Sequence, residues 1–495
     1  MARQDRIGAA VLGLCIALAP EVAALGVPNV AQTPGALLSG PNAPEAGRTP
    51  VIAFHGDMLI TFPEAPGSPP GDYQVRAWDI SDAANPVETQ VLGYTRHGFM
   101  AHGFIKRGEL INSGYTFDVD AAGTVSEASG IDFRMLGWTH GGMSVPWGVT
   151  NYWSYGDTSQ PAEIYLDQPY GAPPLATFNP VGDTGVIGHP FSFGRYLFFA
   201  SDQSRSGIAS YDVSDPANPV LLDVLADGAV GGYWPDPVGI NGKLYFFFPH
   251  DNPAGGFHVV DATDPTDLKL LADVPLAGNL NYAQFQDEYA FSERYKIDMR
   301  TFEVVLELDE DAVSRDGEPI DTSQFSLPIG NLVVTGGIFT GGSCSVPGFS
   351  STHCGTGMSI WAHAAAPDTR GPFVGYHAPA NGETNYPVTH PIQVLIHETL
   401  KSETINAATV RLMPLVDGVP GPQVAADYWF ASNDILSIVP QQDLRSDTVY
   451  RVELVADGIR DAVGNGMQPY SFEFSTGNAL AGANTPPTIT AIDTS

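Results

Sequence analysis

The chain has 495 residues, of which 43% are hydrophobic, so it can bury large cores and is not a disordered polypeptide. Lys and Arg number 22 against 55 Asp and Glu, which gives a formal net charge of −33. Such an acidic protein repels phosphate backbones, which argues against nucleic acid as a partner. The same charge is compatible with bound cations, either Ca²⁺ or a transition metal.

Residues 1–24 have the features of an export signal. A positively charged start precedes an apolar run from Ile7 to Leu18, and a small-residue cleavage site ends at Ala24. The run is too short to span a bilayer, and no later stretch reaches about 18 apolar residues, so we expect no membrane span in the mature chain. The sequence therefore predicts a secreted or cell-surface protein, with a linker over residues 25–49.

Residues 50–372 contain a recurring unit. The sequence WDISDAANP at 78–86 returns as YDVSDPANP at 211–219 and, shortened, as VDATDP at 260–265. Weaker copies bring the number to seven, at a mean spacing of about 47 residues, close to the length of a four-stranded propeller blade. The anchors of the seven copies are Trp78, Phe117, Leu166, Tyr211, Val260, Ile297 and Trp361.

Each unit reads as four short strands. In one copy, the Asn241-Gly242 pair separates two strands and suits a two-residue hairpin turn, because both residues tolerate positive φ. The strand that follows, 243–248, is aromatic, as expected for a strand buried between blades. A third strand at 257–260 leads to the turn 261–265, where Asp side chains can accept hydrogen bonds from nearby backbone N–H groups.

The aromatic strand followed by Asp-x-Ser-Asp-Pro-x-Asn-Pro resembles the LVIVD-repeat β-propellers of bacterial and archaeal surface proteins. The resemblance covers about residues 50–380 and is specific in three copies. It implies a propeller exposed outside the cell. It implies no enzymatic activity and supplies no catalytic motif.

Residues 373–477 show short alternating strands separated by turn signals, which is typical of a β-sandwich. The motifs Pro-x-Asn-Gly, x-Thr-Tyr-x-Val, Asp-x-x-Gly-Asn and Phe-x-Phe-x-Thr-Gly resemble the bacterial Ig-like domains of S-layer and adhesin proteins. The segment 397–399 (HET) departs from that pattern, which usually has an aromatic and small residues there. The chain is therefore expected to be all-β, with about seven propeller blades followed by an Ig-like β-sandwich. Residues 478–495 are a linker or the start of a further domain.

Four polar residues occupy equivalent places at the start of the first strands of different blades. They are His102, His189, Asp236 and Asn281. First strands line the channel of a propeller, so these groups could converge at one mouth and bind a metal or small ligand. The alternative is structural, with each histidine capping a strand or bonding a neighbouring blade.

Cys344 and Cys354 lie ten positions apart in a chain with an export signal, which favours a disulfide that closes a small loop.

The sequence contains no recognised catalytic motif, and we expect a surface protein that binds a glycan, a protein or another surface ligand. Two alternatives stay open at this point. The chain could be a structural segment of a longer surface protein. It could also be a metal-dependent secreted enzyme with its site at the channel mouth.

Overall fold

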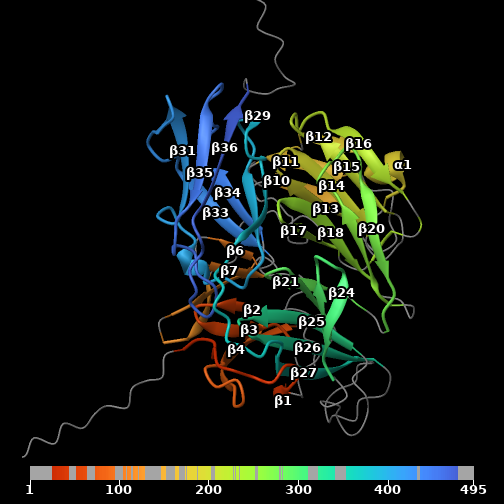
Figure 1. Cartoon of the computed structure of the whole chain (residues 1–495), viewed down its shortest axis with the longest axis vertical. Coiled ribbons are helices and arrows are strands. Elements are labelled where there is room, and N and C mark those ends of the chain that lie inside the picture. The colour runs from red at the N-terminus through yellow and green to blue at the C-terminus, as the bar shows by residue number, and fades with distance from the viewer. Residues whose placement is uncertain are drawn as a thin grey trace, which may run out of the picture.

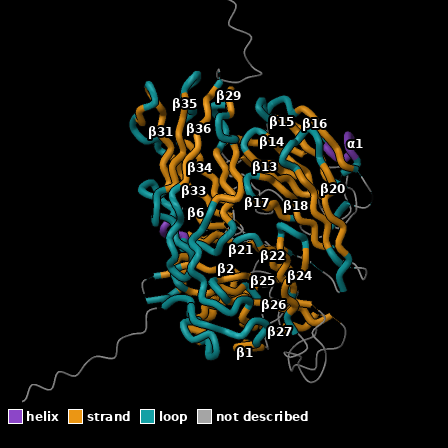
Figure 2. The backbone as a smooth tube through the Cα atoms, viewed as in Figure 1, coloured by secondary structure: helices purple, strands orange, loops and turns teal. Residues whose placement is uncertain are grey.

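The structure is a computed structural model in which nearly all regular elements are β-strands (Figures 1 and 2). The helical elements among the described residues are α1 (Pro180–Thr184) and a 3₁₀ turn at Ser402–Thr404, and neither could cross a membrane. The prediction of an all-β chain is confirmed. The structure describes residues 25–477 except 44–51, 64–72, 95–103, 107–108, 113–114, 121, 129–146, 152–161, 167–172, 174, 187, 202–206, 227, 229, 233–234, 251–254, 278–279, 281, 310–321, 341–352 and 432–434.

The strands β1–β27, here called the N-terminal sheets, form small antiparallel sheets in which neighbours along the chain pair. The first sheets contain β2 (Ile52–His55), β3 (Met58–Thr61), β4 (Tyr73–Asp79), β5 (Val87–Tyr94); β6 (Phe104–Lys106), β7 (Glu109–Asn112), β8 (Tyr115–Val119), β9 (Val125–Ala128); β10 (Trp147–Asn151), β11 (Ala162–Leu166), β12 (Ala176–Phe178). The later ones contain β13 (Gly188–Phe193), β14 (Tyr196–Ser201), β15 (Ile208–Asp212), β16 (Val220–Leu225); β17 (Asp236–Ile240), β18 (Lys243–Pro249), β19 (Phe257–Asp261), β20 (Lys269–Val274); β21 (Ala283–Gln286), β22 (Tyr289–Ser292), β23 (Tyr295–Asp298), β24 (Glu303–Glu307); β25 (Thr322–Ile329), β26 (Leu332–Thr340), β27 (His353–Ala362).

Local turn chemistry sets the register of these sheets. Asn241 and Gly242 both have positive φ, 52° and 78°, as a two-residue hairpin turn between β17 and β18 requires. In the turns after the third strands, a carboxylate accepts the N–H two residues ahead. This occurs at Asp79, Asp212 and Asp261, with Ser81, Ser214 and Thr263 donating. The repeated sequence motif is therefore a self-capping turn.

Adjacent sheets share their cores. Phe199 and Tyr211 pack with Ile164 between the β10–β12 and β13–β16 sheets. Phe191 and Phe246 meet edge to face, 5.3 Å apart, between the next two sheets. Further cores join β17–β20 to β21–β24, β21–β24 to β25–β27, and β25–β27 to β2–β5. Among the described residues, the aromatic second strands β14 and β18 are thus each buried between two sheets.

The interpretation of residues 25–49 as a linker needs correction. Residues 37–42 form β1 (Leu37–Asn42), which pairs antiparallel with β27 as the fourth strand of that sheet. Asn29 fixes the segment before β1. Its Nδ2 donates to the carbonyl of Asp368, and its Oδ1 accepts the N–H of the same residue. This segment carries no copy of the repeat, and its partner strand lies more than 300 residues away, so local sequence could not reveal the pairing.

The strands β28–β36, here called the C-terminal sandwich, form two further layers (Figure 1). One layer has the order β28-β30-β34-β33 and the other β29-β36-β35-β31-β32. The bounds are β28 (Val374–Ala378), β29 (Glu383–Tyr386), β30 (Ile392–Ile396), β31 (Val410–Val416), β32 (Val419–Pro420), β33 (Ala426–Ala431), β34 (Ile435–Pro440), β35 (Val449–Leu454) and β36 (Tyr470–Thr476).

One layer of the sandwich continues directly into an N-terminal sheet. Strand β33 pairs antiparallel with β6, so that Phe430 lies opposite Ile105 in an eight-stranded sheet. Each strand thereby covers an edge that the other would leave open. Residues of both parts also share one core, in which Met58 and Phe62 join Phe430 and Leu436. The two parts are therefore packed as one body.

Candidate functional site

The C-terminal sandwich lies across the hairpin turns that join first and second strands of the N-terminal sheets. The N–H of Gly194 donates to Oε1 of Gln393 at 2.8 Å, and the N–H of Gly242 donates to the carbonyl of Gly375 at 2.8 Å. These contacts come from two different sheets. Because backbone groups make them, they fix the position of the sandwich against the turns.

Three more turns contact the sandwich, two of them through sandwich side chains. Thr399 Oγ1 donates to the carbonyl of Pro328 at 2.6 Å, next to the β25–β26 turn. Lys401 Nζ lies 2.6 Å from Oδ1 of Asp57 in the β2–β3 turn. At the β21–β22 turn, the N–H of Asp287 donates to a sandwich carbonyl at 3.0 Å. The described contacts thus reach turns of five sheets.

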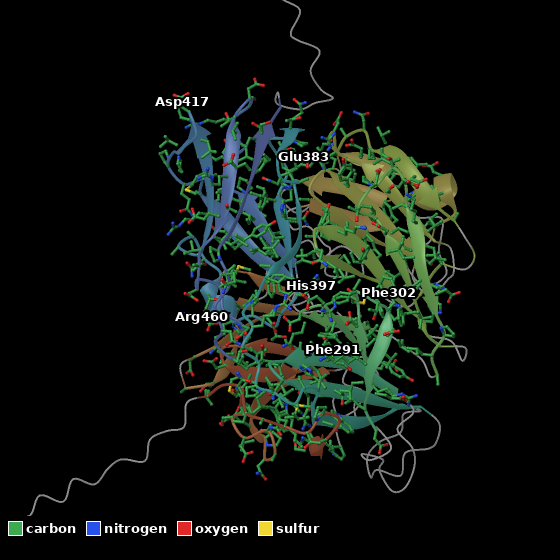
Figure 3. The ribbon with its side chains drawn as sticks, viewed as in Figure 1. Phe291, Phe302, Glu383, His397, Asp417 and Arg460 are labelled. Atoms are coloured by element: carbon green, nitrogen blue, oxygen red, sulfur yellow. The ribbon has the colours of Figure 1, made fainter. Side chains whose placement is uncertain are left out.

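His397 is the centre of this interface and lies between the two parts in Figure 3. Its side chain is fully buried, and its Nε2 accepts the N–H of Gly239 at 2.7 Å, so this nitrogen carries no proton. Its carbonyl accepts the Asp287 N–H. Burial lowers the pKa of His397 to about 4, with the Gly239 hydrogen bond acting in the opposite direction. Neutral His397 therefore links β17 and the β21–β22 turn to the sandwich.

Beside His397, three carboxylates from distant segments converge. Oxygen atoms of Asp368, Glu398 and Asp461 all lie within 4.8 Å of one another. Asp368 precedes β28, Glu398 follows β30, and Asp461 lies in the loop between β35 and β36. Glu398 and Asp461 are each 1% exposed. Among the described residues this is the one group with the spacing of metal ligands.

The electrostatics of the cluster show how unfavourable three bare negative charges are there. Burial raises the pKa of Glu398 well above its usual range, and the charges of Asp287, Asp368 and Asp461 raise it further. Burial likewise raises the pKa of Asp461 to about 6, although Asn465 opposes the shift by donating two hydrogen bonds. The cluster therefore favours a bound positive charge, either a cation or a proton.

Arg370 is the nearest described cation, but its side chain is directed to other acids. It makes hydrogen bonds of 2.6 and 2.8 Å to both carboxylate oxygens of Glu288 and lies 3.4 Å from Asp287. Its guanidinium also stacks over Phe373, 4.2 Å from the ring centre. Within the cluster, its backbone N–H donates to Asp368 at 3.0 Å, and its charge opposes the rise that burial causes in the pKa of Asp368. Arg370 therefore compensates the cluster only in part.

An open cavity of about 460 Å³ lies elsewhere on the same interface. Tyr196 and Arg195, at the β13–β14 turn, form one wall, and Tyr376 and Glu383 of the sandwich face them. Arg195 Nη1 is 3.7 Å from Glu383 and its Nη2 is 3.3 Å from Asp212. Because Arg195 already pairs with Glu383 and Asp212, these charged groups hold the two parts together, and the cavity belongs to the docking interface.

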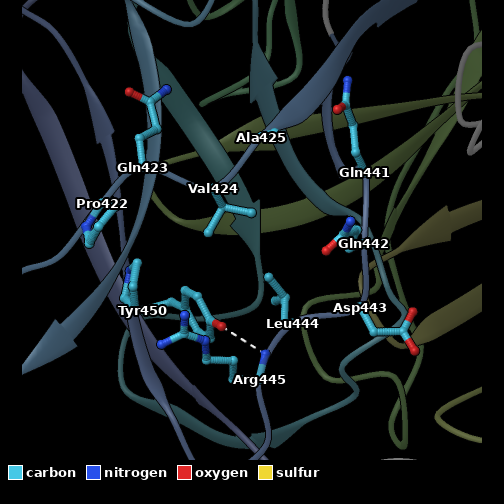
Figure 4. A pocket seen from close by; sticks show the side chains of 11 residues that line it. Pro422, Gln423, Val424, Ala425, Gln441, Gln442, Asp443, Leu444, Arg445 and Tyr450 are labelled. Carbon is cyan, nitrogen blue, oxygen red and sulfur yellow. Dashed lines mark hydrogen bonds between the residues drawn. The ribbon is translucent and has the colours of Figure 1, made fainter.

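A second cavity, of about 330 Å³, lies within the sandwich (Figure 4). Its floor contains Tyr450, whose hydroxyl accepts the backbone N–H of Arg445 at 2.8 Å. This bond ties the start of β35 to the preceding turn, as tyrosine corners do in β-sandwiches. Its other walls include Gln423, Val424 and Gln441, and its charged lining residues are Asp443 and Arg445.

Two of the predicted channel-mouth residues, Asp236 and His189, lie at the starts of first strands, away from the covered turns. Asp236 is the first residue of β17 and is 1% exposed. Burial raises its pKa well above the ordinary value. His189 lies in β13, opposite Ala200, and its side chain is outside the described part. His102 and Asn281 also lie outside the described residues, as do Cys344 and the side chain of Cys354.

The two ends of the N-terminal sheets differ in the length of their connections. At the covered end, first and second strands are joined by two residues, as at 56–57, 194–195, 241–242, 287–288 and 330–331. The covered end also has the turns between third and fourth strands, such as 80–86, 213–219 and 262–268. The opposite end carries the longest connections, which are 62–72, 95–103, 129–146, 152–161, 202–207, 226–235, 250–256, 275–282, 308–321 and 341–352. His102 and Asp236 belong to or border this second group. The end away from the sandwich is therefore where variable surface is available.

Sequence reasoning missed the acidic cluster, because its members stand 30 or more positions apart and belong to no single motif. Two signals were present. Glu398 lies within the segment 397–399, which departs from the Ig-like pattern. Asp461 begins the Asp-x-x-Gly-Asn motif, whose turn holds the carboxylate through the N–H groups of Val463 and Asn465.

Solved structures similar to this chain are propeller-like. A β-fructofuranosidase of Bombyx mori shares 11% identity at a TM-score of 0.27, covering 87% of this chain and 89% of that one. A protein of Lactobacillus plantarum shares 13% at 0.29, covering 52% and 83%. An uncharacterized protein of Listeria monocytogenes shares 9% at 0.30, covering 53% and 82%. Likeness at this level carries no argument about activity.

No curated protein matches the chain in sequence. The resemblance of the repeats to LVIVD propellers stays a prediction. Residues 368–476 match the family described as bacterial Ig-like domain. The C-terminal sandwich is therefore a bacterial Ig-like domain, as its strand motifs predicted.

Proposed function

We propose that this chain is an exported surface protein in which a closed, seven-bladed propeller of LVIVD type presents a binding face. In this arrangement the Ig-like domain covers one mouth of the propeller, and β1 completes the last blade. The long connections at the other mouth form the binding face. Its ligand is a glycan or a protein at a surface, and the protein acts by binding.

The difference between the two ends carries this proposal. The two-residue turns contact the sandwich, so they are not free to bind a ligand. The opposite end holds the long connections, and binding residues concentrate on loops supported by a rigid scaffold. The Ig-like domain supports the surface location, because such domains occur in bacterial surface proteins. The net charge of −33 supports a soluble, exposed surface.

Ring closure rests on the packing of successive sheets. Described cores join the sheets from β10–β12 through β25–β27 and on to β2–β5, and Val125 of β9 joins the core of β2–β5. Contact between β9 and β10 would close the ring. The seven repeat anchors support seven blades, since each lies in a strand of a different sheet, and Trp361 and Tyr211 occupy equivalent positions in β27 and β15.

The test uses the mature chain against a printed panel of glycans and immobilised extracellular proteins. Ala226 and Ala277 are exposed in two long connections, so Ala226→Arg and Ala277→Arg place bulky charges on the proposed face without disturbing a core. We expect at least one probe to bind and either variant to weaken it tenfold or more.

Thr301→Arg is the matched control, because Thr301 is exposed in a short turn at the other end. It should leave binding unchanged. A chain that binds no probe, or binding that only Thr301→Arg abolishes, would contradict the proposed face. Protease treatment of intact producing cells tests the location, since an exported surface protein should be cleaved while cytoplasmic markers survive.

A further inference from the structure

We propose that Asp368, Glu398 and Asp461 bind one Ca²⁺ ion that fixes the Ig-like domain to the N-terminal sheets. The inference is independent of the ligand-binding face, which lies at the opposite end of the sheets.

The geometry fits Ca²⁺. Two oxygens that each bind one ion at about 2.4 Å are at most about 4.8 Å apart. The oxygen atoms of the three carboxylates meet that limit without any movement. All donors are hard oxygens, with no thiolate or imidazole among them, which suits Ca²⁺ rather than zinc or copper. Mg²⁺ requires shorter bonds of about 2.0–2.1 Å and hence a contraction of the site.

A buried amide provides a second observation that points to an ion. Gln286 ends β21 and is 2% exposed, and its Nε2 lies 3.5 Å from Oδ2 of Asp368. The same Nε2 donates to the carbonyl of Gly330 at 2.8 Å. Its oxygen, Oε1, has no hydrogen-bond donor among the described residues. The amide thus turns its donor, Nε2, toward Asp368. Rotation of the amide by half a turn would bring Oε1, a common type of calcium ligand, to that side and relieve the cost of its unmade hydrogen bond.

The carboxylate of Glu398 also accepts few hydrogen bonds. Its carboxylate receives one hydrogen bond within the described structure, from the N–H of Thr399 at a long 3.3 Å. A carboxylate that is 1% exposed and faces two others needs a compensating charge. Since the guanidinium of Arg370 is bonded to Glu288 and only the backbone N–H of Arg370 bonds the cluster, at Asp368, a further cation is the charge that the site lacks.

The position of the cluster gives the ion its role. Asp368 lies on the segment that connects the N-terminal sheets to the sandwich, whereas Glu398 and Asp461 belong to the sandwich. Gln286 belongs to the β21–β22 hairpin of the N-terminal sheets. One ion therefore joins the first residue of the Ig-like domain to both layers of the sandwich, next to Gln286 of an N-terminal sheet. Calcium binding would stabilise the docked arrangement, because Asp368 also bonds Asn29 and Gln286 of the N-terminal part.

The experiment titrates CaCl₂ into the chelator-treated mature chain by calorimetry and measures thermal unfolding in EDTA and in CaCl₂. We expect one Ca²⁺ per chain with a Kd below about 1 mM, the range of extracellular calcium modules, and a higher Tm with Ca²⁺. Glu398→Gln should weaken binding at least tenfold. The variant should unfold at the same temperature in EDTA and in CaCl₂, whereas the wild type should gain stability from Ca²⁺.

Asp461→Asn is a second variant, which keeps the turn-capping oxygen and should also lose the calcium response. Asp264→Asn is the control, since Asp264 is exposed in the β19–β20 turn and should respond to calcium as the wild type does. A wild-type chain whose Tm is equal in EDTA and CaCl₂ would overturn the proposal and indicate a shared proton. Retention of the calcium response by Glu398→Gln would overturn it as well.

Discussion

The two ends of the N-terminal sheets solve different physical problems. At the covered end, turns of two residues meet the sandwich through backbone hydrogen bonds, buried histidine and buried acids. At the opposite end, connections of many residues leave the same strands. A docked end requires fixed shape and satisfied polar groups, whereas an end that faces solvent requires neither. Substitutions should therefore have very different costs at the two ends.

Gly375→Ala should have the largest effect. A Cβ there would lie 2.0 Å from the carbonyl oxygen of Gly239, a backbone contact that no side-chain rotation can relieve. We expect the change to cost more than about 3 kcal/mol in urea unfolding or to separate the sandwich from the turns. Gly93→Ala is the control, because a Cβ there meets nothing within 4 Å. Equal stability of the two variants would contradict the docked arrangement.

Acid should destabilise the interface through His390, whose Nε2 is 2.9 Å from the carbonyl of Val213. Burial lowers the pKa of His390 to about 4, so the folded protein keeps it neutral when the unfolded chain already binds a proton. Stability is thus intact above pH 6.5 and is lost as pH falls from about 6.5 to 4, by about 3 kcal/mol for this group.

His390→Gln, which can still donate to Val213, isolates this contribution, because other titrating groups remain in both proteins. The loss of unfolding free energy between pH 7 and 4.5 should be smaller in the variant. An identical pH slope for the two proteins would show that His390 titrates normally and is not buried at the interface.

Thr399→Val should have an intermediate effect. It removes the donor to the carbonyl of Pro328 and leaves that buried oxygen without its 2.6 Å bond, at a cost of about 1–3 kcal/mol. Thr177→Val, on the exposed face of β12, should be nearly neutral in the same thermal unfolding measurement. If both changes were neutral, Thr399 would not be in contact with the β25–β26 sheet.

Lys401→Met should have the smallest effect. Its pair with Asp57 is partly exposed, so the loss should stay below about 1 kcal/mol and shrink as salt rises. Chemical unfolding at low and high ionic strength measures the loss of unfolding free energy and its dependence on salt. A larger, salt-independent loss would mean that this pair is more deeply buried than the structure indicates.

The sequence predicted what local chemistry determines. The Asn-Gly hairpin turn and the Asp-capped turns are encoded within a few residues, so Asn241 and Asp212 revealed their structures directly. The strand motifs of the Ig-like domain, such as that around Tyr450, are equally local. The docking of the sandwich on the N-terminal sheets and the pairing of β1 with β27 are not encoded locally, because they join segments hundreds of residues apart.

The acidic cluster was hidden for the same reason. Each of its acids is unremarkable in sequence, and only the fold brings Asp368, Glu398 and Asp461 together. Asp236, by contrast, could be placed from sequence at the start of a first strand, and β17 begins at this residue. Its role in binding a ligand stays a prediction.

The central claim is that the Ig-like domain is seated on the hairpin turns, and an engineered crosslink tests it most directly. A Cβ built on Gly330, in the β25–β26 turn, lies 3.8 Å from the Cβ of Val463 in the sandwich, which is the separation that disulfides prefer. In the double variant Gly330→Cys and Val463→Cys, peptide mass spectrometry after oxidation should find the 330–463 disulfide in most molecules, with neither single variant crosslinked there. Two free thiols at these positions under the same conditions would contradict the docked structure.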